Sequence, residues 1–122
     1  MTPDGLVLSD DLIFFSRIAG AARARGLVVR QARAAAELVA IAKQHPPGGV
    51  ILDLQNPGLE LEPLLAELRS LPEAPRVVAY GSHVLADALR AARQAGCERV
   101  MPRSQFAESL EADIAEWLGR DA

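Results

Sequence analysis

The residues best suited to do chemistry in this chain are carboxylates that follow short apolar runs. Asp53 comes directly after Val50–Leu52 and just before an Asn56–Gly58 turn, and Asp10-Asp11 closely follows Leu6–Leu8. A short unbroken apolar run is typical of a strand buried on both faces of a parallel sheet. The carboxyl ends of such strands meet at one edge of the sheet, where α/β proteins place their ligands. The sequence therefore predicts three carboxylates in one acidic pocket.

The elements that must place these carboxylates alternate along the chain. Apolar runs bounded by turns predict strands at residues 5–9, 27–29, 49–54, 77–80 and 99–101. Apolar residues at helical spacing predict helices at 11–25, with Phe15 inward, then at 31–44, 61–68 and 85–95, and a last helix capped by Ser104. Five strand–helix units favour a doubly wound α/β fold with a parallel sheet in the order 2-1-3-4-5. We expect two helices on one face of the sheet and three on the other.

Composition excludes several classes of protein. The chain has 122 residues, a formal net charge of −3 and one cysteine, Cys97. No basic stripe indicates nucleic-acid binding, no apolar run is long enough to span a membrane, and no signal peptide is present. One cysteine excludes an internal disulfide and suits a reducing cytoplasm. We therefore expect a cytoplasmic protein that forms one domain over residues 1–122, with no output domain.

Three motifs, in this order and at this spacing, carry a resemblance to a known family. They are Ser9-Asp10-Asp11, Ile51–Asp53 with Pro57-Gly58 four residues later, and Gln94–Cys97. Together they resemble the acidic pair, the phospho-acceptor strand with its turn, and the Ala-Gly corner of response regulator receiver domains in two-component systems. Asn56 stands where the family has methionine. The resemblance covers nearly the whole chain and implies a flavodoxin-like three-layer (βα)5 sandwich.

The resemblance also implies a chemistry. Asp53 would accept a phosphoryl group from a partner histidine kinase. Asp10 and Asp11 would hold Mg²⁺ together with Asp53 and the backbone carbonyl of Gln55. The cation would neutralise the carboxylates before an anionic group arrives, because Mg²⁺ is a hard ion that takes carboxylate and phosphate oxygens. We expect this Mg²⁺ to bind weakly.

The chain departs from the family at the positions that report phosphorylation. Gly81 stands where the family has a hydroxyl residue, with Ser82 next to it, and Arg103 stands where the family has lysine. Val100 replaces the aromatic switch residue of strand five. We expect an interaction face near these positions that does not depend on phosphorylation and includes His83, Val100 and Phe106.

Each candidate residue also has a purely structural interpretation. Asp53 is either a phospho-acceptor or a strand-end acid that only orders a loop. Asp10 and Asp11 either bind a metal ion or are acids placed at a helix N-terminus, where negative charge is favourable. Arg103 is a phosphate ligand or, as we favour, a permanent counter-ion to the acids. Ser82 is better explained as a helix cap than as the switch hydroxyl.

The leading hypothesis is a stand-alone, atypical or pseudo-receiver that acts through protein–protein interaction and is not an enzyme. It would be a monomer or a weak homodimer. The alternative is a functional single-domain response regulator phosphorylated on Asp53. A flavodoxin-like small-molecule-binding protein is a weaker alternative, because two carboxylates after the first strand would repel a phosphate. A hydrolase would need a Gly-x-Ser-x-Gly nucleophile elbow, which the sequence lacks.

Overall fold

The computed structural model describes residues 2–119, which form five parallel strands and five helices. The strands are β1 (Gly5–Leu8), β2 (Val29–Ala32), β3 (Gly49–Asp53), β4 (Arg76–Gly81) and β5 (Arg99–Pro102). The helices are α1 (Leu12–Ala24), α2 (Ala35–Gln44), α3 (Leu61–Arg69), α4 (Ala86–Gln94) and α5 (Arg103–Trp117). None of these helices is both long enough and apolar enough to cross a membrane, for the residues described.

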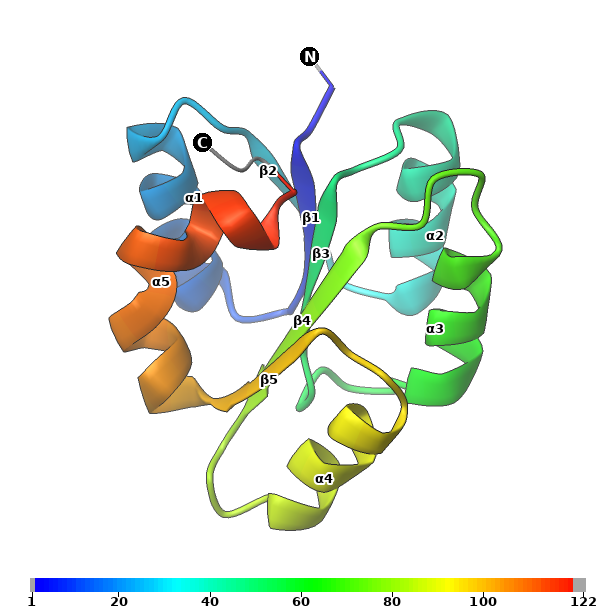
Figure 1. Cartoon of the computed structure of the whole chain (residues 1–122), viewed down its shortest axis with the longest axis vertical. Helices are drawn as coiled ribbons and strands as arrows, with labels where there is room; N and C mark the ends of the chain where they lie inside the picture. The colour runs from blue at the N-terminus through cyan, green and yellow to red at the C-terminus, as the bar shows by residue number, and fades with distance from the viewer. Residues whose placement is uncertain (1, 120–122) are drawn as a thin grey trace.

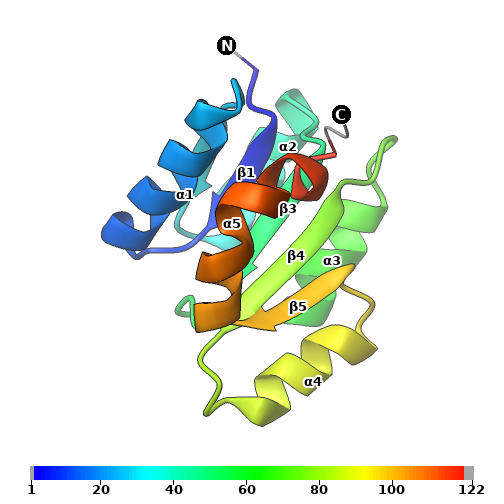
Figure 2. The same ribbon diagram turned by 60° about the vertical axis from the view of Figure 1, so that its left-hand side comes forward.

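The sheet has the order β2-β1-β3-β4-β5, as the sequence predicts (Figure 1). Each face of the sheet has its own apolar core, because alternate residues of each strand point to opposite faces. One core joins the sheet to α1 and α5, and the other joins it to α2, α3 and α4. The expected division into two and three helices is therefore confirmed, and Figure 2 shows α1 and α5 together on one side.

The second strand lies later than the sequence pattern predicts. It begins at Val29, which pairs with Gly5, whereas residues 27 and 28 belong to the preceding loop. The carboxylate of Asp4 accepts a hydrogen bond from the Val28 backbone N–H at 2.8 Å. The apolar run 27–29 was misleading because β2 is an edge strand, whose side chains need not all be apolar. The following helix consequently begins at Ala35, not at residue 31.

The prediction of a helix cap at Ser104 is also wrong, and the prediction for the inward face of α1 is incomplete. Phe14 is buried in α1, and Phe15 is partly buried and packs against the same core. The last helix begins at Arg103 directly after Pro102, so Ser104 lies inside its first turn and caps nothing. Proline at this boundary has a fixed φ that suits the start of a helix. The chain therefore turns from β5 into α5 without a connecting loop, which places Arg103 at the carboxyl edge of the sheet.

The C-terminal end of α5 lies against the start of β3, and this contact depends on glycine. A Cβ atom at Gly49 would overlap the backbone carbonyl oxygen of Trp117, whereas a Cβ atom at Gly20 in α1 would meet no atom within 4 Å. The close approach of two backbones allows Trp117 and Leu118 to be buried against the sheet. The same helix that begins at the candidate site is thus anchored at its other end.

This contact gives a matched pair of stability predictions. Gly49→Ala is expected to destabilise the fold by about 1–3 kcal/mol, because the added methyl group forces two backbones apart. Gly20→Ala is expected to stabilise it by about 1 kcal/mol, because alanine favours a helix interior and nothing is displaced. Chemical denaturation of both variants measures the two effects. Equal effects of the two substitutions would contradict the close approach.

Candidate functional site

Asp53 ends β3 and is almost completely enclosed. Only 6% of its surface is exposed. Its Oδ2 accepts a hydrogen bond from the Ser9 hydroxyl at 3.0 Å, and its Oδ1 accepts one from the Gln55 backbone N–H at 2.9 Å. Both carboxylate oxygens therefore have a donor within the chain, as a buried charged group requires.

Ser9 lies beside Asp53 because of the strand register. Leu8 of β1 pairs with Leu52 of β3, so the next residues along the two strands, Ser9 and Asp53, are neighbours. Ser9 is fully buried, and its hydroxyl also accepts a hydrogen bond from the Asp11 backbone N–H at 3.1 Å. The sequence predicts Asp10 and Asp11 as the neighbours of Asp53, and Ser9 enters this prediction only as the first residue of the Ser9-Asp10-Asp11 motif. The register of the two apolar runs was the signal that could have found it.

Asp11 has a structural role at the start of α1. It is the N-cap residue, and its Oδ1 accepts a hydrogen bond from the Phe14 backbone N–H at 2.9 Å. Its Oδ2 accepts one from the Arg103 guanidinium at 2.6 Å. The Phe14 N–H and the Arg103 guanidinium both lower the pKa of Asp11, the N–H having the larger effect. The counter-ion geometry expected for Arg103 is therefore present.

Arg103 is also held by an aromatic ring. Its guanidinium carbon lies 4.3 Å from the centroid of the Phe14 ring, a distance at which a cation is attracted to the ring face. Both contacts come from the first turn of α1, so Arg103 ties the beginning of α5 to the beginning of α1. About 41% of its side chain remains exposed.

The three predicted carboxylates share one edge of the sheet but differ in their surroundings. Asp53 is buried and bound by Ser9, Asp11 is bound by Arg103, and Asp10 is exposed. Residues 2–119 contain no group of three or more histidine, cysteine, aspartate or glutamate side chains arranged to hold a metal ion. Within the described residues the three predicted carboxylates are therefore not gathered into one three-acid cluster.

The two predicted switch positions lie at the end of β4, where Gly81 is its last residue and Ser82 follows it. Gly81 is buried, and a Cβ atom there would meet Leu54 and Leu89 at 3.4–3.7 Å, which is ordinary van der Waals contact. The Ser82 backbone N–H donates to the side-chain oxygen of Gln55 at 3.2 Å, and its hydroxyl accepts from the Val84 N–H at 3.3 Å. Ser82 thus shapes the loop before α4. It does not cap that helix, which begins at Ala86 with no side-chain cap.

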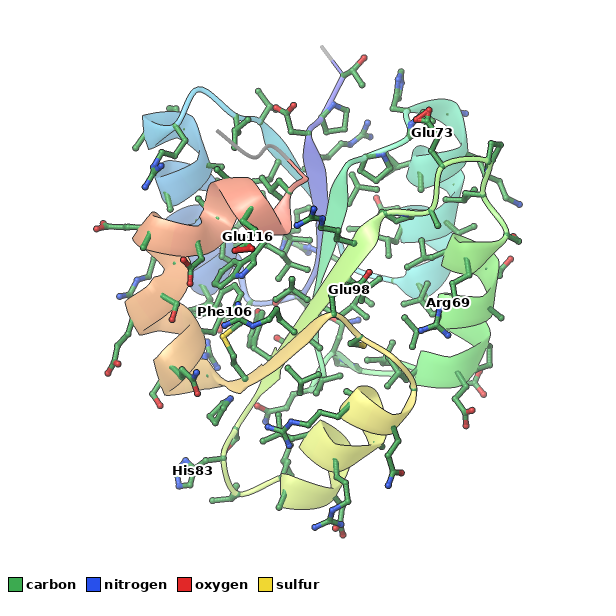
Figure 3. The ribbon with its side chains drawn as sticks, in the orientation of Figure 1. Arg69, Glu73, His83, Glu98, Phe106 and Glu116 are labelled. Atoms are coloured by element: carbon green, nitrogen blue, oxygen red, sulfur yellow. The ribbon has the colours of Figure 1, made fainter. Side chains whose placement is uncertain are left out.

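The predicted interaction face is only partly at the surface. His83 is exposed on the loop between β4 and α4, where Figure 3 shows it pointing away from the body of the protein. Val100 is half-buried and packs against the core. Phe106 is fully buried between α5 and the sheet, so its assignment to a surface was wrong. Its place on the inward stripe of α5 explains its burial.

Phe106 belongs to an aromatic cluster that reaches the site. Its ring centroid lies 4.6 Å from that of Tyr80 and 4.9 Å from that of Trp117, while Phe14 lies 5.1 Å from Tyr80. Tyr80 pairs with Asp53 across the sheet, and its buried hydroxyl finds no hydrogen-bond partner among residues 2–119. Burial, followed by the nearby charge of Asp53, raises the pKa of Tyr80 well above its usual value. Sequence reasoning assigned Tyr80 only to a strand.

Comparison with known proteins identifies the class. No model of a known protein family matches the chain. The photosynthetic apparatus regulatory protein RegA of Cereibacter sphaeroides is 35% identical over 91 residues, which are 72% of this chain and 48% of RegA. The chain thus spans about half the length of this curated relative.

Solved receiver structures match nearly the whole chain. The receiver domain of NtrX from Brucella abortus matches with a TM-score of 0.79 at 26% identity. The match covers 98% of this chain and 100% of that one. The receiver domain of the sensor histidine kinase PA1611 from Pseudomonas aeruginosa, solved with a magnesium ion in its active-site cleft, has a TM-score of 0.78 at 18% identity, over 98% of this chain and 99% of that one. The chain is a receiver domain of the response-regulator type.

The Asp11–Arg103 pair predicts a pH-dependent stability. The pKa of Asp11 is lowered in the folded protein, so the pair stabilises the fold above the ordinary carboxyl value of 3.8 and is lost as the pH falls through the lowered value. Arg103→Met is expected to lower the melting temperature by a few degrees at neutral pH and by less in strong acid. Thermal unfolding followed by circular dichroism over a pH series measures the difference.

The matched control is Asp11→Asn, which keeps an oxygen to accept the Phe14 N–H but removes the charge. The effects of the two substitutions should be less than additive in the double variant, since each removes the same ion pair. An Arg103→Met effect that is independent of pH would show that Arg103 acts only by stacking on Phe14.

Proposed function

We propose that this chain is an atypical receiver, a protein-interaction module of a two-component-type pathway whose output does not depend on Mg²⁺-assisted phosphorylation of Asp53. The single observation that carries the proposal is the enclosure of Asp53. Its two oxygens accept hydrogen bonds from Ser9 and Gln55, and only 6% of its surface is exposed. A nucleophilic carboxylate oxygen must be accessible to phosphorus, and here the carboxylate is almost fully enclosed and each of its oxygens already accepts a hydrogen bond.

The residues around Asp53 support the same proposal. A serine takes the position beside Asp53 at the end of β1, so the pocket carries less negative charge and attracts a divalent cation less strongly. The Arg103 guanidinium, which could bind a phosphoryl oxygen, is already bound to Asp11 and stacked on Phe14. Gly81 offers no hydroxyl to bind a phosphoryl oxygen. A ligand that makes no differential contact in two states cannot shift their balance.

The alternative is a functional response regulator phosphorylated on Asp53 by a histidine kinase. The position of Asp53 favours it, because a carboxylate at the end of the central strand β3 is at the edge where such sheets bind ligands. The exposed Asp10 and the backbone carbonyl of Gln55 would be the residues left to bind Mg²⁺. In this alternative the Ser9 hydroxyl would have to turn away from Asp53.

The effect of Mg²⁺ on the melting temperature distinguishes the two hypotheses. The wild-type protein gives the answer, and Ser9→Asp shows what a metal-binding pocket would look like in the same measurement. Wild-type protein is expected to melt at the same temperature with Mg²⁺ and with EDTA. Ser9→Asp is expected to be less stable in EDTA, because it places two carboxylates side by side, and to be stabilised by Mg²⁺. Metal at 100 times its dissociation constant would contribute about 2.7 kcal/mol.

Ser9→Asn is the control for this comparison, because it has nearly the same volume as aspartate but adds no charge. It should show no Mg²⁺ effect. A wild-type melting temperature that rises with Mg²⁺ would favour the alternative hypothesis.

A phosphoryl mimic tests the output directly. Beryllofluoride with Mg²⁺ is expected to leave the amide spectrum of the wild-type protein unchanged at α4 and β5. A triple variant, Ser9→Asp with Gly81→Thr and Arg103→Lys, restores the carboxylate, hydroxyl and ammonium groups, and a Cβ atom at Gly81 meets Leu54 and Leu89 only at ordinary van der Waals distance. This variant is expected to respond, and adding Asp53→Asn should abolish its response. Shifts that spread from Asp53 to α4 and β5 in the wild-type protein would disprove the proposal.

A further inference from the structure

A groove lies away from Asp53, between α1 and α5. It has a volume of about 800 Å³, and Figures 1 and 2 both show the two helices side by side. Half of the residues that line it are small, namely Ser16, Gly20, Ala21, Ala24 and Ala107. Small residues on a helix surface allow another backbone to approach closely.

The two helices that form the groove carry opposite charges. The range of α1 contains the arginines 17 and 23 and no acidic residue, and Arg25 follows directly. After Arg103, the range of α5 contains four acidic residues and no basic one. Arg17 and Arg25 line one wall of the groove, and Glu108 and Glu111 line the other.

These opposite charges form no recorded ion pair with each other in the part of the chain that the structure describes. Arg25 does reach across the groove, but its guanidinium donates to the backbone carbonyl of Glu111 at 2.8 Å rather than to a carboxylate. The groove therefore presents a basic wall and an acidic wall, both exposed.

We propose that this α1–α5 groove is a docking surface for a second copy of the same chain. A two-fold axis brings the same patch of both copies together. It would set the basic α1 wall of one copy against the acidic α5 wall of the other, and the same pairing would form twice. A second copy thus supplies the opposite charge for both walls at once. The proposal does not depend on whether Asp53 is phosphorylated.

Charge reversal with exchange of partners tests this arrangement. The acidic-groove variant carries Arg17→Glu and Arg25→Glu, and the basic-groove variant carries Glu108→Arg and Glu111→Arg. Wild-type protein is expected to show a concentration-dependent dimer in sedimentation velocity, weakened by salt because the charges are exposed. Each variant alone is expected to be monomeric, and their equimolar mixture to form a heterodimer.

A charge-matched control excludes nonspecific attraction. Glu62→Arg with Glu67→Arg makes the same charge change on exposed positions of α3. This control is expected to dimerise by itself like the wild type and not to recruit the acidic-groove variant. Recruitment by the α3 control would overturn the proposal, as would a mixture of the two groove variants that stays monomeric.

A steric variant provides an independent test. Gly20→Gln projects a long side chain into the groove, while a Cβ atom at this position meets nothing in the monomer. The variant is expected to melt at or above the wild-type temperature and yet to lose the dimer. A wild-type protein that stays monomeric up to millimolar concentration, or a Gly20→Gln variant that still dimerises, would overturn the proposal.

Discussion

The hydrogen bond between the Ser9 hydroxyl and Asp53 is the contact around which the carboxyl edge of the sheet is arranged. A buried carboxylate without donors would be costly, and the parallel register of β1 and β3 supplies the donor by placing Ser9 next to it. The same hydroxyl accepts the Asp11 backbone N–H and so fixes where the chain leaves the strand. The first turn of α1 and the environment of Asp53 are therefore set by one side chain, and a change at Ser9 would affect both.

From this point one series of contacts continues into α5, while a shorter one passes through Gln55 to Ser82 in the loop before α4. Asp11 binds Arg103, Arg103 lies over Phe14, and Phe14 packs on Tyr80 within the aromatic cluster that ends at Trp117. On the other face, α4 buries only Leu89 and Ala92. The candidate site is thus coupled by packing to α1 and α5, the two helices that also form the charged groove. Any partner that binds this face would contact elements held in place by the surroundings of Asp53.

The receiver fold and the phosphorylation chemistry of receivers place different requirements on the sequence. The fold needs buried parallel strands, right-handed crossovers and glycines where α5 meets β3, and this chain has all of them. The chemistry depends on how Asp53 and the charged groups near it are presented to a ligand. Here Asp11 and Arg103 bind each other, and Asp53 accepts hydrogen bonds from Ser9 and Gln55. The proposal of an atypical receiver rests on this arrangement.

The sequence by itself determined the class of fold, the strand order and the position of Asp53 at a strand end, because unbroken apolar runs and helical spacing are local patterns. It also indicated Arg103 as a counter-ion. It could not give the start of β2, since an edge strand need not have a continuous apolar pattern, nor the burial of Phe106, since α5 has both a buried and an exposed face. The role of Ser9 and the groove between α1 and α5 required the tertiary structure, because each depends on the register or packing of segments far apart in the chain.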